Sequence, residues 1–550
     1  MQPEGTAAPR VPPGIERLAA EEIPAVAVAL ALEPARRTLP EPDEAMVTLL
    51  DREAEYRAGA GRDTVLSRLC LLTALIGPCK HEAAQSFALD QGLIGTRADW
   101  VDLSERYLGC YPSEPGFLSR PGPEPLADAQ VLHTLTSGRR TVGGVDAEWA
   151  RRLVRSFGEV GDRADEPREQ ALTNGLLVLA RLAQASFGFY RECLHPLLAE
   201  EPGFACRHGG PGLAAVVELA ETGRVRRDLL ERIRQALPPD STRDVSLDQS
   251  VYRLEQLLER DVAVPPGPER RLRLGAAAYR AGYLSAAAEA VLQAVTEFRT
   301  LHAADPAQHV AGFCRALITA SRIQGERGAA RQALELAEEA ERWSSRVREV
   351  GVNQGAALAN LAARKLAETG VRGGPAPGTA RKAVDYLRML VSGDLSYRAD
   401  LAAALTILSD VLGKSGAPEE ALGVAEEAVG LCDDLGTANP WAYRHLLATA
   451  RKCRSARFAD MADFDRALVD AQGAVELFDQ VAQASPSRFR PALAEARLWH
   501  AELLKASGAP EADCMTAAEA AVAVFRTLTE GTADATDQQR ERARVLGVTW

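Results

Sequence analysis

A regular spacing of landmarks in the second half constrains the fold of this chain more than any other feature. Leu401, Leu447 and Leu493 each open a similar Leu-Ala segment, and successive members stand 46 residues apart. Pro440 and Pro486 keep the same interval. Self-similarity at a fixed interval of about 20 to 50 residues is typical of repeat architectures, in which each unit buries its apolar face against its neighbours. The spacing therefore predicts an array of helix pairs.

One repeat unit shows the helix-turn-helix pattern most clearly. Residues 402–413 are expected to form its first helix, 414–418 the turn and 419–435 the second helix. Small residues at regular offsets let paired helices approach toward the short end of the usual interaxial range of about 8–10 Å. Three units share this alanine template, at Ala333, Ala337 and Ala340, at Ala421, Ala425 and Ala428, and at Ala467, Ala471 and Ala474. About six such units are expected.

Changes in composition and Pro/Gly-rich breaks divide the rest of the chain into regions. Short helical segments precede a Pro/Gly-rich stretch between Pro112 and Pro125 that has room for a small hairpin, which favours a winged-helix-like module. Longer helical patterns follow it. The expected organisation is all-α, with a loosely packed tail at 1–40, a winged-helix-like domain at 41–137, a helical arm at 138–262 and a tetratricopeptide-type solenoid at 263–550.

Composition and charge favour a helical cytoplasmic protein that does not bind nucleic acid. A formal net charge of −12 opposes broad phosphate neutralisation. Nine scattered cysteines without a C-x-x-C pair fit reduced thiols. The apolar stretch from Ile23 to Leu32 is too short to span a bilayer, which needs about 20 residues. We therefore expect a cytoplasmic location and no membrane partner.

Three partial matches to catalytic or cofactor motifs each lack a group that the chemistry requires. Residues 373–378 match the glycine spacing of a phosphate-binding loop, but Thr379 stands where a lysine is required. His81 begins a zinc-protease-like helix whose second histidine is replaced by Gln85. Cys206 and His208 lack a third, orienting group. The sequence predicts no enzyme activity, no cofactor and no metal site.

One charge cluster is a candidate for partner binding. It consists of Arg444, Arg451, Lys452, Arg454 and Arg457, all on one expected helix. Three of these arginines fall on one face at 100° per residue. Such a stripe could grip an acidic peptide or a phosphate group. The alternative, which we favour, is a solvated face that pairs with Asp and Glu residues of the adjacent helix.

The second half resembles tetratricopeptide repeats of the longer actinobacterial type. Leu-Ala opens the first helix of each unit, and the signature of the second helix stands as EEALGVAEEAV from Glu419 to Val429. Asp513 departs from the template, which has alanine there. The resemblance covers about half the chain and implies a helical solenoid.

The first half is similar to the region that follows the nucleotide-binding domain in STAND-type signalling NTPases with such repeats. The residues that carry this likeness are Leu49 to Tyr56, Gly77-Pro78, Tyr107 to Pro112 and Pro125 to Asp128. The resemblance implies a winged helix, a helical arm and a repeat sensor. The P-loop domain of that family has no counterpart in this sequence, which implies a separately encoded NTPase or a stand-alone or decayed relative.

These observations favour a non-enzymatic scaffold or sensor that binds a protein or peptide in the groove of the repeats. A separate NTPase or effector protein is a further expected partner. The alternative is a transcriptional regulator that uses the winged helix on DNA. Residues 126–135, the expected recognition helix, contain no Lys or Arg, which opposes that alternative.

Overall fold

A computed structural model describes residues 41–58, 63–121, 124–157, 166–240, 242–260, 267–345, 351–369, 376–528 and 537–548. The chain divides into two compact units, Met1–Ala236 and Leu237–Trp550, which are treated separately below. The expected tail at 1–40, with its apolar stretch, and loop residues 371–375 lie outside the described residues. The winged-helix and arm boundaries expected from the sequence stay predictions.

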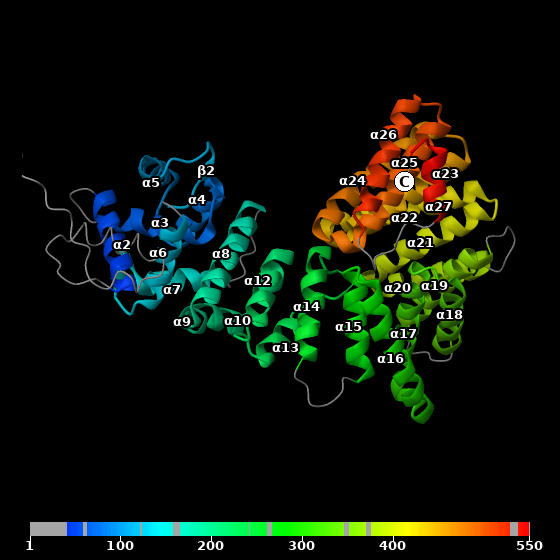
Figure 1. The fold of residues 1–550 in the computed structure, drawn as a ribbon, viewed down its shortest axis with the longest axis horizontal. Coiled ribbons are helices and arrows are strands. Elements are labelled where there is room, and N and C mark those ends of the chain that lie inside the picture. The colour runs from blue at the N-terminus through cyan, green and yellow to red at the C-terminus, as the bar shows by residue number, and fades with distance from the viewer. Residues whose placement is uncertain are drawn as a thin grey trace, which may run out of the picture. The chain divides into compact units, whose positions relative to one another are not determined.

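The first unit is helical with two very short strand pairs (Figure 1). Its helices are α2 (Pro42–Ala58), α3 (Thr64–Ile76), α4 (His81–Asp90), α5 (Arg97–Cys110), α6 (Glu124–Thr136), α7 (Ala147–Ser156), α8 (Glu166–Ala185), α9 (Phe187–Phe189), the π-helix η2 (Tyr190–Leu194), α10 (His195–Glu200), α11 (Phe204–Arg207), α12 (Gly209–Glu221) and α13 (Arg227–Gln235). Its strands are β1 (Cys79–Lys80), β2 (Phe117–Leu118), β3 (Thr141–Val142) and β4 (Val145–Asp146).

The hairpin of this unit does not lie where the sequence analysis placed it. Strand β2 falls inside the Pro112 to Pro125 stretch, but it pairs with the distant β1. The local hairpin is β3–β4, whose two turn residues Gly143 and Gly144 have φ values of +56° and +79°. A two-residue hairpin turn of type I′ needs positive φ at both positions, which glycine adopts without strain. The apolar helix α3 forms the buried centre, with Leu69 to Ile76 all buried.

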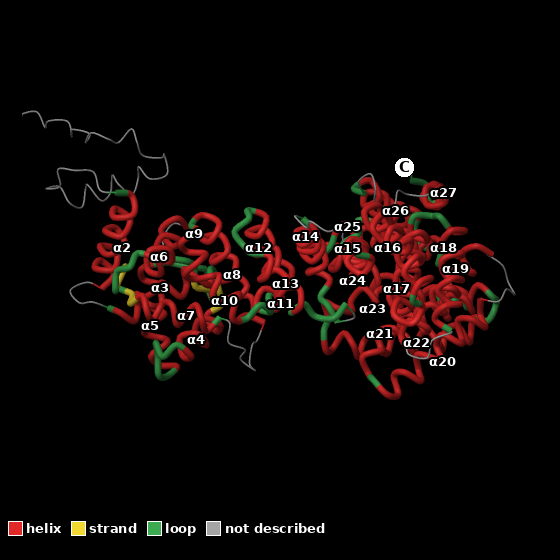
Figure 2. Tube along the Cα trace, turned by 90° about the horizontal axis from the view of Figure 1, so that it is seen from below, coloured by secondary structure: helices red, strands yellow, loops and turns green. Residues whose placement is uncertain are grey.

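The second unit is an all-α solenoid of paired helices (Figure 2). Its elements are η3 (Val245–Leu247), α14 (Asp248–Glu259), α15 (Pro268–Arg280), α16 (Leu284–Ala304), α17 (Pro306–Glu326), α18 (Ala330–Ser344), α19 (Gly351–Thr369), α20 (Ala376–Gly393), η5 (Leu395–Tyr397), α21 (Arg398–Lys414), α22 (Pro418–Ala438), α23 (Pro440–Asp460), α24 (Phe464–Ala484), α25 (Pro486–Ala506), α26 (Glu511–Arg526) and α27 (Asp537–Val545). From α15 to α26, each helix packs against the next along the chain. The described residues thus contain six helix pairs, as predicted.

Local sequence explains where these helices begin. Pro306, Pro418, Pro440 and Pro486 each stand in the first turn of a helix, where the missing amide proton has no intrahelical partner to lose. Asn439 caps α23 by accepting a hydrogen bond from the amide of the third residue beyond it. The 46-residue interval between Pro440 and Pro486 is therefore the interval between equivalent helix starts.

The alanine template forms the contact between the two helices of a pair. All nine template alanines are at most 1% exposed. In three pairs a hydrogen bond from a serine hydroxyl accompanies this contact. Ser321, Ser409 and Ser455 each donate to the carbonyl of the first template alanine, 12 residues later, at 2.7 to 2.8 Å. Small residues thus permit the close approach, and a buried hydrogen bond fixes its register.

The turn between paired helices requires a left-handed residue. Glycine takes this position at Gly282, Gly328, Gly416 and Gly508, with φ between +79° and +88°. In the pair α23–α24 the equivalent residue is Ala462, whose φ is +56°. A side chain in this conformation costs about 1–2 kcal/mol.

Replacing Ala462 by glycine is therefore expected to stabilise the α23–α24 pair by about 0.5–1 kcal/mol, since relief of strain exceeds the extra entropy that glycine loses on folding. Denaturant-dependent hydrogen exchange of α23 and α24 amides in the 550-residue chain measures the effect. Ala459→Gly, which removes a side chain from the last turn of α23, should have the opposite sign. Equal or faster exchange in the Ala462→Gly variant would show that the turn stores no such strain.

The solenoid closes on itself, because the start of α25 contacts the first helix pair. A Cβ atom on Gly282 would lie only 2.5 Å from the amide nitrogen of Arg488 and would also overlap the backbone of Ser487. The Arg488 guanidinium pairs with Glu326 at 2.7 Å, and its Cζ lies 4.4 Å from the centre of the Tyr279 ring. Helix pairs that are distant in the sequence therefore enclose an interior space.

Candidate functional site

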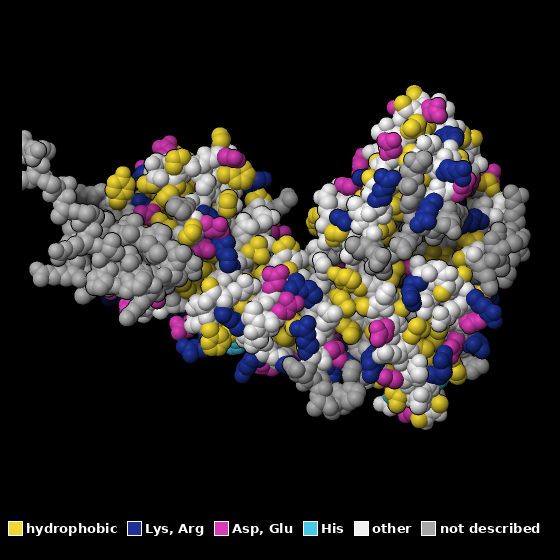
Figure 3. Space-filling view, in the orientation of Figure 1, with side chains coloured by type: hydrophobic (Ala, Val, Ile, Leu, Met, Phe, Trp, Pro, Cys, Tyr) yellow, Lys and Arg dark blue, Asp and Glu magenta, His cyan; other side chains and the backbone are white. Residues whose placement is uncertain are grey.

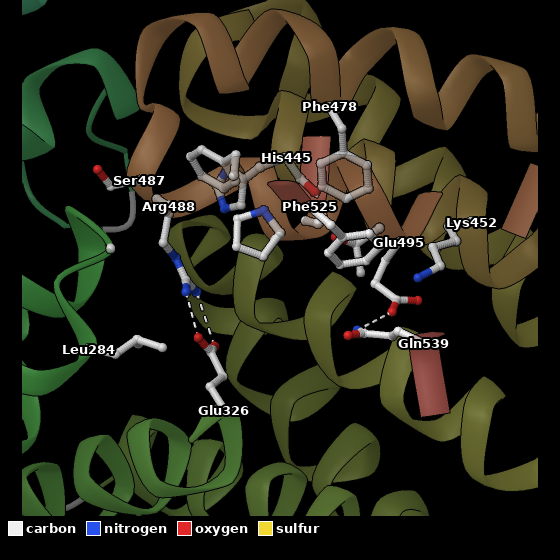
Figure 4. A pocket seen from close by; sticks show the side chains of 15 residues that line it. Leu284, Glu326, His445, Lys452, Phe478, Ser487, Arg488, Glu495, Phe525 and Gln539 are labelled. Atoms are coloured by element: carbon white, nitrogen blue, oxygen red, sulfur yellow. Dashed lines mark hydrogen bonds and ion pairs between the residues drawn. The ribbon is translucent and has the colours of Figure 1, made fainter. Parts of the chain in front are cut away.

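A cavity of about 390 Å³ lies between the first helix pairs of the solenoid and its last helices (Figure 4). Helices from both ends of the array form its walls. Its lining includes Leu284 of α16, Glu326 of α17, Lys452 of α23, Glu495 of α25 and Gln539 of α27. The closure of the array thus creates a chamber that no single helix pair could form.

One end of the cavity is the closure contact itself. Arg488 donates to both carboxylate oxygens of Glu326, at 2.7 and 3.3 Å, and to the Tyr279 hydroxyl at 3.2 Å. Burial opposes ionisation of Glu326, but the charge of Arg488 and hydrogen bonds from Arg488 and Tyr279 together hold its pKa below the usual range. The charges at this end are therefore already satisfied by one another.

The middle of the cavity is apolar. Phe478, Phe489 and Phe525 contribute ring atoms to the wall, and each is at most 7% exposed. His445 lines the same region, and its ring centre lies 5.6 Å from that of Phe489. Burial, with the nearby charges of Arg280 and Arg488, lowers the pKa of His445 to about 3. His445 is therefore neutral at physiological pH and adds no charge to this surface.

The far end carries Lys452 and Glu495, which Figure 4 shows approaching each other. The carboxylate of Glu495 accepts one hydrogen bond from Gln539 and another from Arg542 at 3.0 Å. Arg542 also makes a two-pronged contact with Glu502, at 2.6 and 2.9 Å. Burial opposes ionisation of Glu495, but the charges of Lys452 and Arg542 and hydrogen bonds from Gln539 and Arg542 together hold its pKa below the usual range.

A second cavity of about 360 Å³ adjoins the first across the closure contact. The two share His445, Arg488 and Phe489 as lining residues. Its other walls include Arg322 and Asp400. The solenoid therefore offers two adjacent spaces with different surfaces, the first more apolar and the second more charged.

The structure separates the five cations that the sequence placed in one candidate cluster. Arg454 makes a two-pronged bond with Asp470 of α24, at 2.6 and 2.8 Å. Arg457 is 5% exposed and donates to the carbonyl of Ser409 at 2.8 Å. Groups of neighbouring helices hold both of these arginines.

The remaining three differ from one another. Arg451 lies 3.7 Å from Asp433. Arg444 stacks on the exposed ring of Trp441, with its Cζ 4.0 Å from the ring centre. Lys452 alone of the five lines the 390 Å³ cavity. Partner binding by the cluster stays a proposal, and Lys452 is the member placed to take part in it.

The two histidines considered as catalytic or metal-binding candidates in the sequence analysis each pack against an aromatic ring. His81 starts α4 and packs edge-on against Trp100, 5.9 Å between ring centres. His208 packs against Phe204 at 4.6 Å, and burial lowers its pKa to about 4. Within the described ranges no group of three or more His, Cys, Asp or Glu residues is arranged to hold a metal ion. All nine cysteines are free.

Comparison with known proteins names no family for this chain. No family model matches the sequence, and no curated protein matches it. Among solved structures, a signal transduction ATPase with a tetratricopeptide repeat sensor from Pyrococcus horikoshii matches at 11% identity and a TM-score of 0.35, over 96% of this chain and 68% of that one. The Rap conjugation gene regulator of plasmid pLS20, in complex with the Phr* peptide, matches at 10% identity and 0.38, over 84% and 95%. A tetratricopeptide repeat protein from Thermus thermophilus matches at 20% and 0.25, over 40% and 98%.

At these values the matches carry no argument about the fold or the ligands of this chain. Among the residues that the structure places, no helix is long and apolar enough to cross a membrane. The surface of the second unit in Figure 3 shows Lys and Arg side chains interspersed with Asp and Glu, without one continuous basic field on that face.

Proposed function

We propose that this chain is a non-enzymatic scaffold or sensor that binds a peptide inside its closed repeat array. The observation that carries the proposal is the cavity of about 390 Å³ enclosed by both ends of the solenoid. Ligand sites are typically concave, mostly apolar and equipped with a few placed polar groups. The phenylalanine walls and the two charged ends of this cavity meet that description.

The arrangement favours recognition over catalysis. His445 is the imidazole of the cavity wall, and a pKa of about 3 leaves it a weak base at neutral pH. The hydroxyl of Thr449 donates to a backbone carbonyl of its own helix at 2.8 Å and is not activated by this histidine. A preformed chamber binds with little ordering cost, which suits a scaffold or sensor.

A cavity-filling variant tests the proposal. Ala492 lines the cavity, so Ala492→Trp should block it, whereas Ala506→Trp adds the same ring at an exposed position of the same helix. Both variants and the wild type are screened against a random heptapeptide library, and circular dichroism checks their folding. We expect the wild type and Ala506→Trp to enrich the same peptides and Ala492→Trp to bind them at least tenfold more weakly. An empty screen, or enrichment indifferent to Ala492→Trp, would remove the proposal.

We further propose that the winged-helix-like part at 41–137 docks a separate protein, such as an NTPase or effector. Support comes from the compact helical packing of this region around α3. Reconstitution with a candidate NTPase encoded nearby, with and without residues 41–137 masked by an antibody fragment, tests the contact. Readout of DNA by this region has no comparable support, since α6 lacks Lys and Arg and buries Gln130, His133 and Thr134.

A further inference from the structure

The two charged ends of the cavity differ in one respect that bears on the ligand. At the closure end, Arg488 and Glu326 satisfy each other. At the far end, the ammonium group of Lys452 forms no hydrogen bond and no ion pair within 4.0 Å with any residue that the structure describes. An ammonium group has three donors, and all three are unused here.

The neighbouring acids do not supply the missing acceptors. The oxygens of Glu495 are occupied by Gln539 and Arg542, and Arg542 ties Glu502 into the same network. Burial lowers the pKa of Lys452 despite the acids around it. Lys452 therefore feels the charge of Glu495 without a hydrogen bond to it, and an anionic ligand group would supply the acceptor that its ammonium group lacks.

The wall beside Lys452 selects an apolar group. Phe478 and Phe525 line the same cavity, and Pro491 and Ala492 extend the apolar surface. Figure 4 shows Phe478 and Phe525 between the closure contact and Lys452. The cavity volume of about 390 Å³ is at the low end of ligand pockets, which span about 300–1,000 Å³. It therefore holds one or two residues and not an extended segment.

We propose that the cavity receives the C-terminal residue of a peptide, with a large apolar side chain among the phenylalanine rings and the free carboxylate bound by Lys452. The inference rests on the proposed function and names the part of the peptide that enters. In a C-terminal residue, the apolar side chain and the carboxylate are attached to the same Cα atom. Both groups can therefore fit into a cavity of this size. An N-terminal amine is disfavoured, because the group of the cavity with unused hydrogen-bonding capacity is itself a cation.

Fluorescence anisotropy with defined peptides tests the proposal. The probes are fluorescein-labelled Gly-Ser-Gly-Ser-Gly peptides extended by C-terminal Phe, Leu or Gly, each as the free acid and as the amide. The Phe or Leu acid should bind the 550-residue chain at least tenfold more tightly than its amide and than the Gly acid. Lys452→Met should bring the acid-to-amide ratio close to one, and Lys452→Arg should keep most of the preference. Equal binding of acid and amide, or an unchanged ratio in Lys452→Met, overturns the inference.

Two further measurements distinguish failure of this inference from failure of the proposed function. The melting temperature of Lys452→Met should stay close to that of the wild type, because the cost of burying the ammonium group offsets its attraction to Glu495. A clear fall would assign Lys452 to the internal charge network and contradict the inference. If the heptapeptide screen yields binders that Ala492→Trp blocks but that bind equally well as amides, the inference fails and the proposed function stands. If neither screen nor probes bind, both fail.

Discussion

Replacing Gly282 by alanine is expected to open the contact that closes the solenoid. The added Cβ would overlap the backbone of Ser487 and lie 2.5 Å from the amide nitrogen of Arg488. Backbone atoms cannot rotate away as a flexible side chain can, so the α15–α16 turn must separate from α25. We expect a loss of about 1–3 kcal/mol from this overlap, in addition to about 1–2 kcal/mol of backbone strain at φ +88°.

The control for this prediction is Gly416→Ala. Gly416 occupies the equivalent turn at φ +86°, but nothing lies within 4 Å of its Cβ position. It should therefore show the backbone strain alone. Hydrogen exchange in the first turns of α25 should accelerate in Gly282→Ala and stay unchanged in Gly416→Ala. Equal destabilisation by the two substitutions would mean that the array does not close through Gly282.

Removing the carboxylate of Asp470 is expected to cost about 2 kcal/mol. Asp470 is 6% exposed and its two oxygens bind Arg454 at 2.6 and 2.8 Å, so Asp470→Asn leaves a partly buried guanidinium without its counter-charge. The estimate lies below the 3–5 kcal/mol typical of fully buried pairs, because the Arg454 side chain is 24% exposed. Hydrogen exchange of the α23–α24 pair measures the change.

An exposed pair of the same geometry provides the comparison. Arg381 also makes a two-pronged contact, with Glu420, but its side chain is 48% exposed and that of Glu420 is 50% exposed. Glu420→Gln should cost at most about 0.5–1 kcal/mol. The double variant Arg454→Leu/Asp470→Leu should be less destabilised than Asp470→Asn, since no charge is stranded. If Asp470→Asn and Glu420→Gln cost the same, burial does not strengthen the Arg454 pair.

Much of the repeat array could be predicted because its determinants are local. The interval from Pro440 to Pro486 reproduces the interval between helix starts, and the alanines at 421, 425 and 428 form the close contact within a pair. The hairpin at 141–146 was missed although its Gly143-Gly144 turn is a strong two-residue signal. The pairing of β1 with β2 joins Cys79 to Leu118 and Lys80 to Phe117, which are distant in the sequence, and it has no local signal.

The cavity was not predictable for a similar reason. In the sequence, Gly282 cannot be distinguished from the other turn glycines, and no neighbouring residue indicates that it contacts Ser487. The charge cluster on α23 could be located, but the fate of each cation depends on neighbours in other helices. Arg454 faces Asp470, whereas Lys452 faces the interior. The spacing of residues along one helix predicts the direction in which each side chain leaves the helix axis. It does not predict which residues of other helices each side chain meets.

Photo-crosslinking tests most directly whether a peptide occupies the interior of the array. The heptapeptide most enriched by the wild type is resynthesised with a benzophenone group at each position in turn, and crosslinked residues are identified by mass spectrometry. The account predicts labels on the cavity walls, in residues 445–452 of α23, 478 of α24 and 487–495 of α25, and their loss in Ala492→Trp. Labels confined to the first unit or to the outer surface of the helix pairs would contradict it.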